Sequence, residues 1–440
     1  MRRIYIFLFT MSLFLSCRSY QQASQNSFQK SENKVVEIDY SNNIYSALCE
    51  PSIVINRKNP NNIIAGSIYN NVYTSDDMGK TWQKAKLHSP YGVFGDPCLA
   101  SDNQGHIYYL HLSDPENKGH KSSKLIDRIV IQSSVDNGKT WTTGTGIGHN
   151  PPKQQDKHWI GVNPKTGALA VTWTEFDKYE SKNPNDHSRI LFSRSDDFGK
   201  TWTNPVKINQ FDGDCSDDDM TTEGAVPVFD KQGNIYVAWA FNDKIYFDKS
   251  TDGGKTWLKN DIVVANQPQG WTFDVPRIYR TNGLPVLAID NSNGKNAGTL
   301  YINWADQRNG KDNTDIFISK STDKGKTWSK PIKVNRDNTK THQFLTWLAV
   351  DPTTGYLYII YYDRSKYDDY RTDVVLAYSN DGGKNFNYKT ISNQPFIPKK
   401  NPFFGDYNNI DAYRGIVTPV WTELTKDKIS IKTTTIKINQ

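Results

Sequence analysis

The sequence predicts an all-β fold, a β-propeller of seven blades, and three observations lead to this prediction. A turn motif, Ser-x-Asp-x-Gly-x-Thr-Trp, occurs six times, and successive serines lie between 55 and 71 residues apart. Short runs of strand-forming residues flank each copy, and the 3.6-residue periodicity of a helix is not evident after residue 34. A repeat of this period is typical of a propeller or a solenoid.

The six motifs define the turns of the predicted blades. They are Ser75–Trp82, Ser134–Trp141, Ser195–Trp202, Ser250–Trp257, Ser321–Trp328 and a degenerate copy, Ser379–Phe386. The Asp can accept hydrogen bonds from backbone N–H groups in a tight turn, and the Gly supplies a positive φ. These motifs resemble the Asp-box repeats of bacterial sialidases and related glycosidases. The resemblance implies a propeller with each box between the third and fourth strands of a blade, and it leaves activity open.

Alignment of the remaining sequence gives seven units. The predicted first strands start near Glu50, Asp96, Asp156, Glu223, Asp274, Phe344 and Asp406. The seventh unit has no motif and lacks an outer strand, which we expect residues 35–38 to provide, so that the ring closes without exposed edges. Residues 35–440 are then a single propeller domain. A ring of six blades, as in sialidases, is the alternative.

The N-terminal residues predict export from the cytoplasm. Arg2 and Arg3 precede a short apolar run, residues 4–15, as in a signal peptide. Cys17 follows a small residue and resembles the lipidated cysteine of bacterial lipoproteins, so residues 1–17 are the predicted signal peptide. Residues 18–34 are predicted to be a flexible tether. We therefore expect a protein of the bacterial cell envelope that meets the membrane only through its lipid anchor, with ordinary secretion as the alternative.

Charge and cysteine content argue against a nucleic-acid-binding protein and against a disulfide-rich scaffold. The formal net charge is +6, but most of it lies in residues 1–34, so no clustered basic face for nucleic acid is expected. Besides Cys17 there are three cysteines, and at most one disulfide is possible, for which Cys49 and Cys98 are candidates. We expect a monomer.

The strand order predicts where the chemistry lies. The start of each first strand and the end of each second strand share one face of a propeller, and the boxes lie on the opposite face. Six of the seven first-strand starts carry a carboxylate and should form one ring at a channel mouth: Glu50, Asp96, Asp156, Glu223, Asp274 and Asp406. Burial and like charge raise some pKa values in such a ring, and glycosidases use pairs with separated pKa values as acid and base. Bracing of blade against blade is the structural alternative.

Calcium is a further possibility for this face. Residues 212–219 form an acidic loop before Glu223 and loosely resemble a Ca²⁺ loop, because hard oxygen ligands suit this ion. A solvated loop is the preferred interpretation, and the sequence predicts no required metal or cofactor.

Three arginines on the predicted acid-bearing face support an anionic substrate. Arg277, followed by Arg308 and the box at Ser321, resembles the start of sialidases, in which an Arg-Ile-Pro strand precedes a second Arg, a catalytic Asp and an Asp box. Here Pro276 precedes the Arg, and the stretch falls in the fifth unit instead of the first. The resemblance implies that Arg277, Arg308 and Arg364 bind a sugar carboxylate. Surface salt bridges are the alternative.

These features predict a cell-surface, sialidase-like exo-glycosidase that cleaves terminal sugars from glycans. The candidate catalytic residues are Glu223, Asp406, Tyr407 and Asp156. The candidate substrate-binding residues are Arg277, Arg308, Arg364, Trp159, Glu50, Asp96 and Asp274. Trp159 is included because flat rings pack on pyranose faces, although core packing explains most Trp residues of this chain. The alternatives are an inverting glycosidase with two carboxylates, as in Asp-box xyloglucanases, and a non-catalytic propeller that binds glycan or protein.

Overall fold

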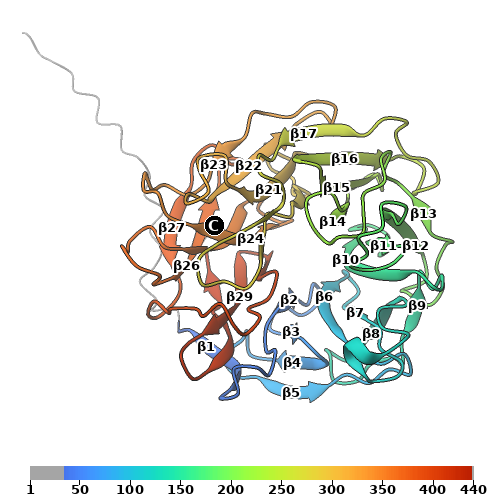
Figure 1. The fold of residues 1–440 in the computed structure, drawn as a ribbon, viewed down its shortest axis with the longest axis horizontal. Helices are drawn as coiled ribbons and strands as arrows, with labels where there is room; N and C mark the ends of the chain where they lie inside the picture. Colours follow the sequence, from blue (N-terminus) through green and yellow to red (C-terminus); the bar gives the residue numbers. More distant parts are fainter. Residues whose placement is uncertain (1–33, 439–440) are drawn as a thin grey trace, which may run out of the picture. The chain divides into compact units, whose positions relative to one another are not determined.

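The computed structural model describes residues 34–438, and these form a seven-bladed β-propeller (Figure 1). The predicted signal peptide, Cys17 and nearly all of the tether lie outside the described residues. Within them the only helix is a single 3₁₀ turn, η1 (Gly119–Lys121), and none is long and apolar enough to cross a membrane.

Six blades are four-stranded antiparallel sheets whose strands follow one another in the chain. Blade 1 contains β2 (Ser52–Ile55), β3 (Ile63–Ser67), β4 (Asn71–Ser75) and β5 (Gln83–Lys86). Blade 2 contains β6 (Gly95–Ser101), β7 (Ile107–Leu112), β8 (Ile129–Ser134) and β9 (Thr145–Ile147). Blade 3 contains β10 (Gln154–Val162), β11 (Leu169–Phe176), β12 (Ser188–Ser195) and β13 (Val206–Lys207).

The second half of the ring repeats this order. Blade 4 contains β14 (Glu223–Phe229), β15 (Ile235–Phe241), β16 (Lys244–Ser250) and β17 (Ile262–Asn266). Blade 5 contains β20 (Val286–Ile289), β21 (Leu300–Asp306), β22 (Asp315–Ser321) and β23 (Ile332–Lys333). Blade 6 contains β24 (Gln343–Val350), β25 (Leu357–Asp363), β26 (Asp373–Ser379) and β27 (Asn387–Thr390).

The seventh blade joins the two ends of the propeller. It contains β28 (Asn409–Tyr413), β29 (Ile416–Leu424) and β30 (Ile429–Thr433), and its outer strand is β1 (Val36–Ser41). Val36 pairs with Thr433 and Ser41 with Ile429, and the short β31 (Ile436–Lys437) pairs with β29. The prediction that the N-terminal strand closes a ring of seven blades is confirmed, and the alternative of six blades is wrong.

The Asp boxes connect the third and fourth strands, as predicted. In the blade 3 box, the Asp197 carboxylate accepts the Thr201 N–H at 2.9 Å and the Thr201 hydroxyl. The Ser195 hydroxyl accepts the Gly199 N–H at 2.9 Å, and the Trp202 indole N–H donates to the Gly199 carbonyl at 3.1 Å. The other boxes repeat the Asp contacts with the turn, which shows that these side chains serve the turn. The Trp328 indole N–H of the fifth box has no partner, and the sixth box has Phe386 in place of Trp.

One first strand differs from its prediction. Residues around Asp274 form an extra hairpin between blades 4 and 5, made of β18 (Thr272–Phe273) and β19 (Thr281–Asn282). Pro276 has no N–H to continue a ladder, and Arg277 has a positive φ of 66°. The channel-lining strand of blade 5 is therefore β20, and Asp274 is exposed on the hairpin, outside the ring of acids.

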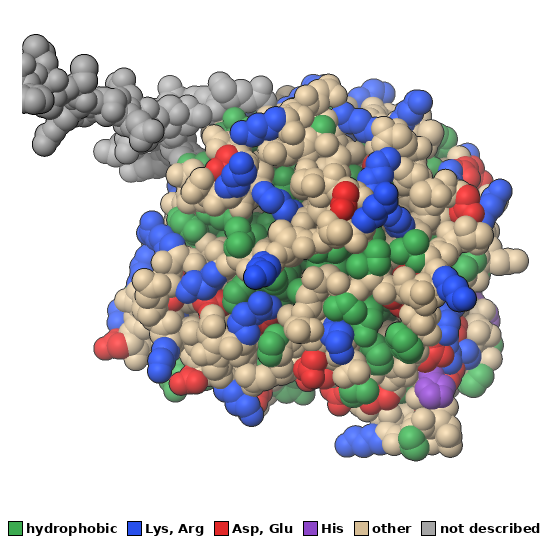
Figure 2. All heavy atoms as spheres, turned by 90° about the horizontal axis from the view of Figure 1, so that it is seen from above, with side chains coloured by type: hydrophobic (Ala, Val, Ile, Leu, Met, Phe, Trp, Pro, Cys, Tyr) green, Lys and Arg blue, Asp and Glu red, His purple; other side chains and the backbone are tan. Residues whose placement is uncertain are grey.

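The edge of the propeller carries charges of both signs. Figure 2 views this edge and shows Lys and Arg side chains scattered among Asp, Glu and uncharged residues. The four largest buried side chains, Trp173, Trp239, Trp304 and Trp421, all lie on second strands inside the blades. The core therefore lies where the blades pack against one another. Side chains other than these four tryptophans line the central channel.

Candidate functional site

A β-bulge recurs where the first strands begin, and it turns side chains toward one channel mouth. The pairing register shifts at this place in blades 2, 3, 4 and 6. Backbone φ is positive at Asp96 (54°), Lys157 (47°) and Leu345 (47°) in these bulges, and at Glu50 (52°) in blade 1. Such a conformation is unfavourable for residues other than Gly, and bulges commonly redirect side chains beside functional sites.

Five of the six predicted acids meet at this mouth, which we call the acid-bearing mouth. They are Glu50, Asp96, Asp156, Glu223 and Asp406. The charges of Asp96 and Asp406 act on Glu50, that of Asp406 on Asp96, that of Asp96 on Asp156, and that of Asp156 on Glu223. Glu50 also accepts the backbone N–H of Asp406 at 3.0 Å. The ring prediction is thus confirmed for five acids and wrong for Asp274.

Two cations that the sequence analysis did not select lie among these acids. The Lys157 ammonium donates to Asp406 at 2.8 Å and lies 3.6 Å from Asp96. The Arg280 guanidinium binds both oxygens of Asp406, with its Nε donating at 2.9 Å. The Asp406 carboxylate is nearly inaccessible, whereas the Arg280 side chain is 32% exposed. Arg280 is therefore the cation of the cluster that a solute can reach.

The acids of the cluster have opposite protonation tendencies. Burial alone would raise the pKa of Asp406, but Arg280 and Lys157 hold it well below its ordinary value. Burial raises the pKa of Asp156 to about 7, aided by Asp96 and Asp217 and opposed by Lys157. Burial and the charge of Asp217 raise the pKa of Glu223 strongly, and neither of its oxygens has a hydrogen-bond partner. The mouth thus holds an ionised carboxylate beside acids that retain protons.

A tyrosine and an aspartate extend this cluster toward solvent. The Tyr179 hydroxyl donates to Asp217 at 2.9 Å, and Arg280 Nη1 donates to the same oxygen at 2.9 Å. Burial, followed by the charges of Asp156 and Asp217, raises the pKa of Tyr179. Both residues lie in loops, Tyr179 after β11 and Asp217 before β14. The acidic loop 212–219 was the one sequence signal for this pair.

Two of the predicted arginines lie together near the extra hairpin. Arg364 is buried and donates to the Pro276 carbonyl at 2.8 Å and to Thr372 at 3.1 Å. Its Nη2 has no hydrogen-bond partner. Arg277 is exposed, and both guanidinium groups stack on the Tyr370 ring, at 5.3 Å for Arg277 and 5.8 Å for Arg364. Burial lowers the pKa of Arg364 to about 10, and Arg277 contributes to this shift.

The third predicted arginine is occupied by its own strand. Arg308 Nε donates to both oxygens of Asp306, at 2.9 and 3.0 Å, and Nη2 donates to the Asn266 carbonyl at 3.1 Å. Its guanidinium also stacks on Phe317 at 4.1 Å. Arg308 therefore forms a local salt bridge, which was the alternative interpretation of this residue.

Three aromatic residues close the channel beneath the acids. Trp159 lies 4.4 Å from Trp347 and 5.2 Å from Tyr407, measured between ring centroids. The Tyr407 hydroxyl donates to the Pro97 carbonyl at 3.2 Å. A cavity of about 20 Å³ between this aromatic plug and the acids has no room for a sugar. Trp159 and Tyr407 are thus placed in core packing, away from the accessible part of the mouth.

Two other predictions concern cysteine and calcium. Cys49, Cys98 and Cys215 are buried free thiols, so the candidate Cys49–Cys98 disulfide is not formed. Residues 34–438 contain no group of three or more His, Cys, Asp or Glu side chains arranged to hold a metal ion. In loop 212–219, Asp214 accepts hydrogen bonds from Ser216 and Thr221.

Comparison with known proteins agrees with this architecture. The BNR/Asp-box repeat family model matches residues 73–84, which include the whole of the first box, Ser75–Trp82. The chain is 24% identical over 315 residues to a sialidase of Bacteroides fragilis strain YCH46. The protein is a seven-bladed propeller with Asp-box turns, and part of its sequence is similar to a sialidase. The match covers 64% of this chain and 52% of the relative, so it spans about half of that enzyme's length.

Solved sialidase structures share the fold of this propeller. A mutant of the NanB sialidase from Streptococcus pneumoniae superimposes with a TM-score of 0.51 at 10% identity, covering 86% of this chain and 84% of that one. The same enzyme in complex with a chlorobenzylammonio-ethanesulfonate gives 0.50 at 11% identity, covering 86% and 83%. Identity this low supports the fold alone.

Proposed function

We propose that the protein is a sialidase-like glycoside hydrolase that acts at the acid-bearing mouth. The observation that carries this proposal is the hydrogen-bonded chain from the Tyr179 hydroxyl through Asp217 to Arg280. This chain lies beside Asp406, whose pKa is lowered, and Asp156, whose pKa is raised. Sialidases differ from most retaining glycosidases in using a tyrosine as nucleophile. The similarity to a sialidase over 315 residues supports the same class of substrate.

Tyr179 has the surroundings of an activated nucleophile. A phenol with a raised pKa is a weak nucleophile unless a neighbouring base accepts its proton during attack. Asp217 is placed to do so, because it already accepts the Tyr179 hydroxyl at 2.9 Å. Arg280, which binds the same Asp217 oxygen, holds the carboxylate in position. Attack of the Tyr179 oxygen on the anomeric carbon would form a glycosyl–tyrosine bond as the bond to the leaving oxygen breaks.

Asp156 is the candidate for the acid that protonates the leaving oxygen. A general acid works best when its pKa is close to the operating pH, and the pKa of Asp156 is about 7. Its charge acts on Tyr179, so the two groups face the same region. After departure of the aglycone, the ionised Asp156 would take a proton from the water that hydrolyses the intermediate.

Arg277 and Arg364 are suited to hold the substrate carboxylate. Neither guanidinium group forms an ion pair with a carboxylate among residues 34–438, and a carboxylate binds such groups with paired hydrogen bonds. Arg277 lies three residues before Arg280 on the hairpin, so the hairpin joins the anion-binding pair to the acid cluster. A buried cation such as Arg364 is costly without a counter-charge, and a bound carboxylate would supply one.

A glycan-binding propeller without catalysis is the second candidate. Most acids of the cluster are buried, and Arg308 is occupied by Asp306. Exposed tyrosines occur on this face at Tyr45 (69% exposed), Tyr69 (48%) and Tyr279 (54%), and such rings pack on sugar faces. Binding without bond cleavage would require only these outer contacts.

Release of a fluorogenic aglycone from an α-sialoside tests the proposal. We expect turnover by the wild type. For Tyr179→Phe we expect kcat/KM to fall by at least about 100-fold, in line with the contribution of a positioned catalytic group. Tyr40→Phe, which removes an exposed hydroxyl on β1, is the matched control and should be unchanged. Sialoside binding without turnover by the wild type would favour the second candidate, and full activity of Tyr179→Phe would exclude Tyr179 as the nucleophile.

A further inference from the structure

A large cavity lies on the opposite side of the aromatic plug from the acids. Its volume is about 720 Å³, and the first strand or the following turn of every blade contributes to its wall. Because the first strands end here and the boxes follow the third strands, this cavity opens on the Asp-box face. We call it the box-side cavity. The plug of Trp159, Trp347 and Tyr407 separates it from the candidate catalytic site.

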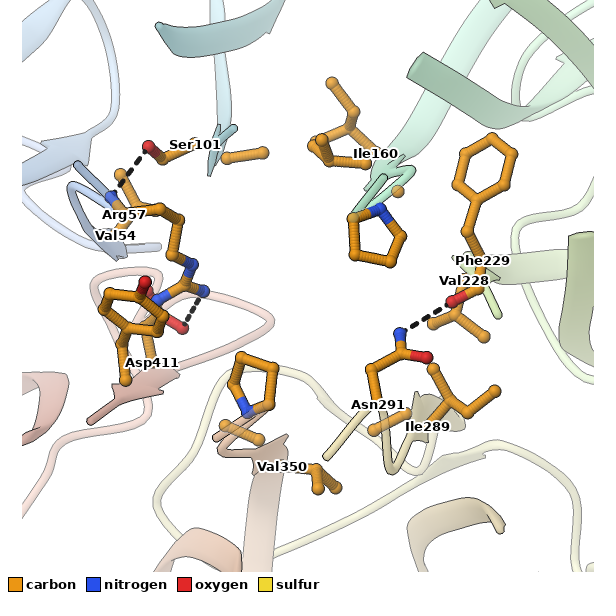
Figure 3. Close-up of a pocket in the computed structure, with 18 of the residues that line it drawn as sticks. Val54, Arg57, Ser101, Ile160, Val228, Phe229, Ile289, Asn291, Val350 and Asp411 are labelled. Atoms are coloured by element: carbon orange, nitrogen blue, oxygen red, sulfur yellow. Dashed lines mark hydrogen bonds and ion pairs between the residues drawn. The ribbon is translucent and has the colours of Figure 1, made fainter. Parts of the chain in front are cut away.

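The wall of the box-side cavity is apolar in its middle. Figure 3 shows Val54, Ile160, Val228, Ile289 and Val350 around an open centre. Several apolar wall residues are partly exposed, including Ile160, Val228 and Ala288. An aromatic floor lies below them, because Trp159 and Trp347 both line the cavity. Concave apolar walls of about 300–1,000 Å³ are typical of sites for small organic ligands.

Side chains of neighbouring blades cover part of the polar backbone of this wall. The inner edge of a first strand has no strand partner, so its N–H groups face the channel. The Ile55 N–H donates to Asp411 at 2.8 Å, and the Leu99 N–H donates to Ser52 at 3.1 Å. The Arg57 N–H donates to Ser101 at 3.2 Å (Figure 3). In blades 1 and 2 these contacts leave a less polar surface for a ligand.

The rim of the cavity is polar and has excess positive charge. Asp411 is neutralised by Arg57 at 2.7 Å, and Asp102 is engaged by His106 and Tyr108 at 2.7 and 2.9 Å. Lys165 and Lys231 line the same rim from blades 3 and 4. Lys231 donates only to neutral oxygens, those of Ser292 and Asn293, and neither lysine forms an ion pair within residues 34–438. Two cations are therefore available to an anion.

We infer that the box-side cavity binds one amphiphilic carboxylate, an acyl chain with its carboxylate at Lys165 and Lys231 and its apolar chain directed toward the aromatic floor. Polarity falls from the rim to the floor, which matches an anionic head and an apolar tail. The Asn291 amide donates to the Phe229 carbonyl at 2.8 Å and braces blades 4 and 5 at the rim, so the site is largely preformed. This inference does not depend on the proposed glycosidase activity.

Titration of the wild-type protein with dodecanoate, below its micelle concentration, tests the inference by calorimetry. We expect saturable binding of one dodecanoate per chain. The Lys165→Ala/Lys231→Ala double variant should bind at least about tenfold more weakly, equivalent to the loss of about 1.4 kcal/mol. The matched control is Lys200→Ala/Lys255→Ala, which removes exposed box lysines from the same two blades. Its affinity should equal that of the wild type.

A second variant tests the location of the chain. Ala288→Phe should block the cavity and abolish binding, and Ala100→Phe replaces it if the first variant unfolds at a lower temperature. Absence of saturable binding by the wild type would overturn the inference, as would binding that Ala288→Phe leaves unchanged. Equal affinity for dodecanol would contradict the role of the lysines. Tighter binding of an apolar peptide through its free C-terminal carboxylate would overturn the choice of an acyl chain.

Discussion

The Asp boxes and the acid-bearing mouth place the same kind of side chain in opposite states. In the boxes, carboxylates such as Asp197 are partly exposed and accept several hydrogen bonds from their own turn, which lower the pKa of Asp197 to about 2. At the mouth, burial raises the pKa of Asp156 to about 7 and that of Glu223 well above its ordinary value. Only Asp406 is ionised there as strongly as a box aspartate, because two cations bind it.

This difference shows how one chain separates structure from chemistry. A carboxylate surrounded by N–H donors stabilises a turn and has no proton to give at neutral pH. A carboxyl group crowded with other acids away from water keeps its proton and can exchange it near pH 7. The boxes therefore hold the outer parts of the blades, and the mouth is the part of the molecule suited to acid and base catalysis.

The largest expected effect is that of removing the ionised acid of the mouth. Asp406→Asn leaves Lys157 and Arg280 without their main counter-charge in a buried site, which should lower the free energy of unfolding by about 3–5 kcal/mol. Asp243→Asn, at an exposed residue with positive φ in the β15–β16 turn, is the control and should have little effect. Urea unfolding followed by fluorescence measures both. A loss below about 1 kcal/mol for Asp406→Asn would mean that the cluster is solvated.

A box aspartate should have a smaller effect and no influence on the mouth. Asp197→Ala removes the acceptor of the Thr201 and Lys200 N–H groups, and we expect a loss of about 1–2 kcal/mol in unfolding free energy. The adjacent Asp196→Ala, which breaks only a surface pair with Arg194, should cost less than about 1 kcal/mol. Neither variant should change sialoside binding, and a binding defect in Asp197→Ala with normal stability would contradict the assignment of the boxes to structure.

The two sets of carboxylates also predict opposite dependence of stability on pH. Asp156 binds its proton more tightly in the folded state, so its contribution is fully present below pH 4 and is lost as the pH rises through 7. Asp197 binds its proton less tightly when folded, so its contribution is present above pH 4 and is lost as the pH falls toward 2. Melting temperatures between pH 4 and 8 should therefore fall less steeply for Asp156→Asn than for the wild type. Identical slopes would show that Asp156 is ionised throughout.

The sequence predicted the parts of this arrangement that repeat. The boxes and the first-strand acids recur at fixed places in each period, so their faces followed from strand order. Asp274 was assigned wrongly because Asp274-Val275-Pro276 imitates Asp96-Pro97, although it belongs to an inserted hairpin. Asp306 and Arg308 carry opposite charges and lie two residues apart in the sequence. The ion pair between them explains why Arg308 is not free to bind a ligand.

The remaining site residues depend on contacts that the position within the repeat does not determine. Lys157 reaches the acids because a bulge gives it a positive φ, and Arg280 reaches them from the extra hairpin. Tyr179 and Asp217 lie in two loops that meet only in the folded ring. No spacing in a single sequence encodes such contacts between distant segments, which is why the sequence analysis selected Tyr407 among the catalytic candidates and missed Tyr179.

Covalent trapping with a sialosyl fluoride that carries a second fluorine on the carbon next to the anomeric carbon tests the central claim most directly. The fluorine beside the anomeric carbon slows hydrolysis of the intermediate, so a sialidase-like enzyme with a tyrosine nucleophile accumulates a glycosyl–tyrosine adduct. We predict one added sugar on the peptide that contains Tyr179, seen by mass spectrometry, and none in Tyr179→Phe. An adduct on Tyr407, or sialoside hydrolysis by the wild type without any adduct, would contradict the assignment.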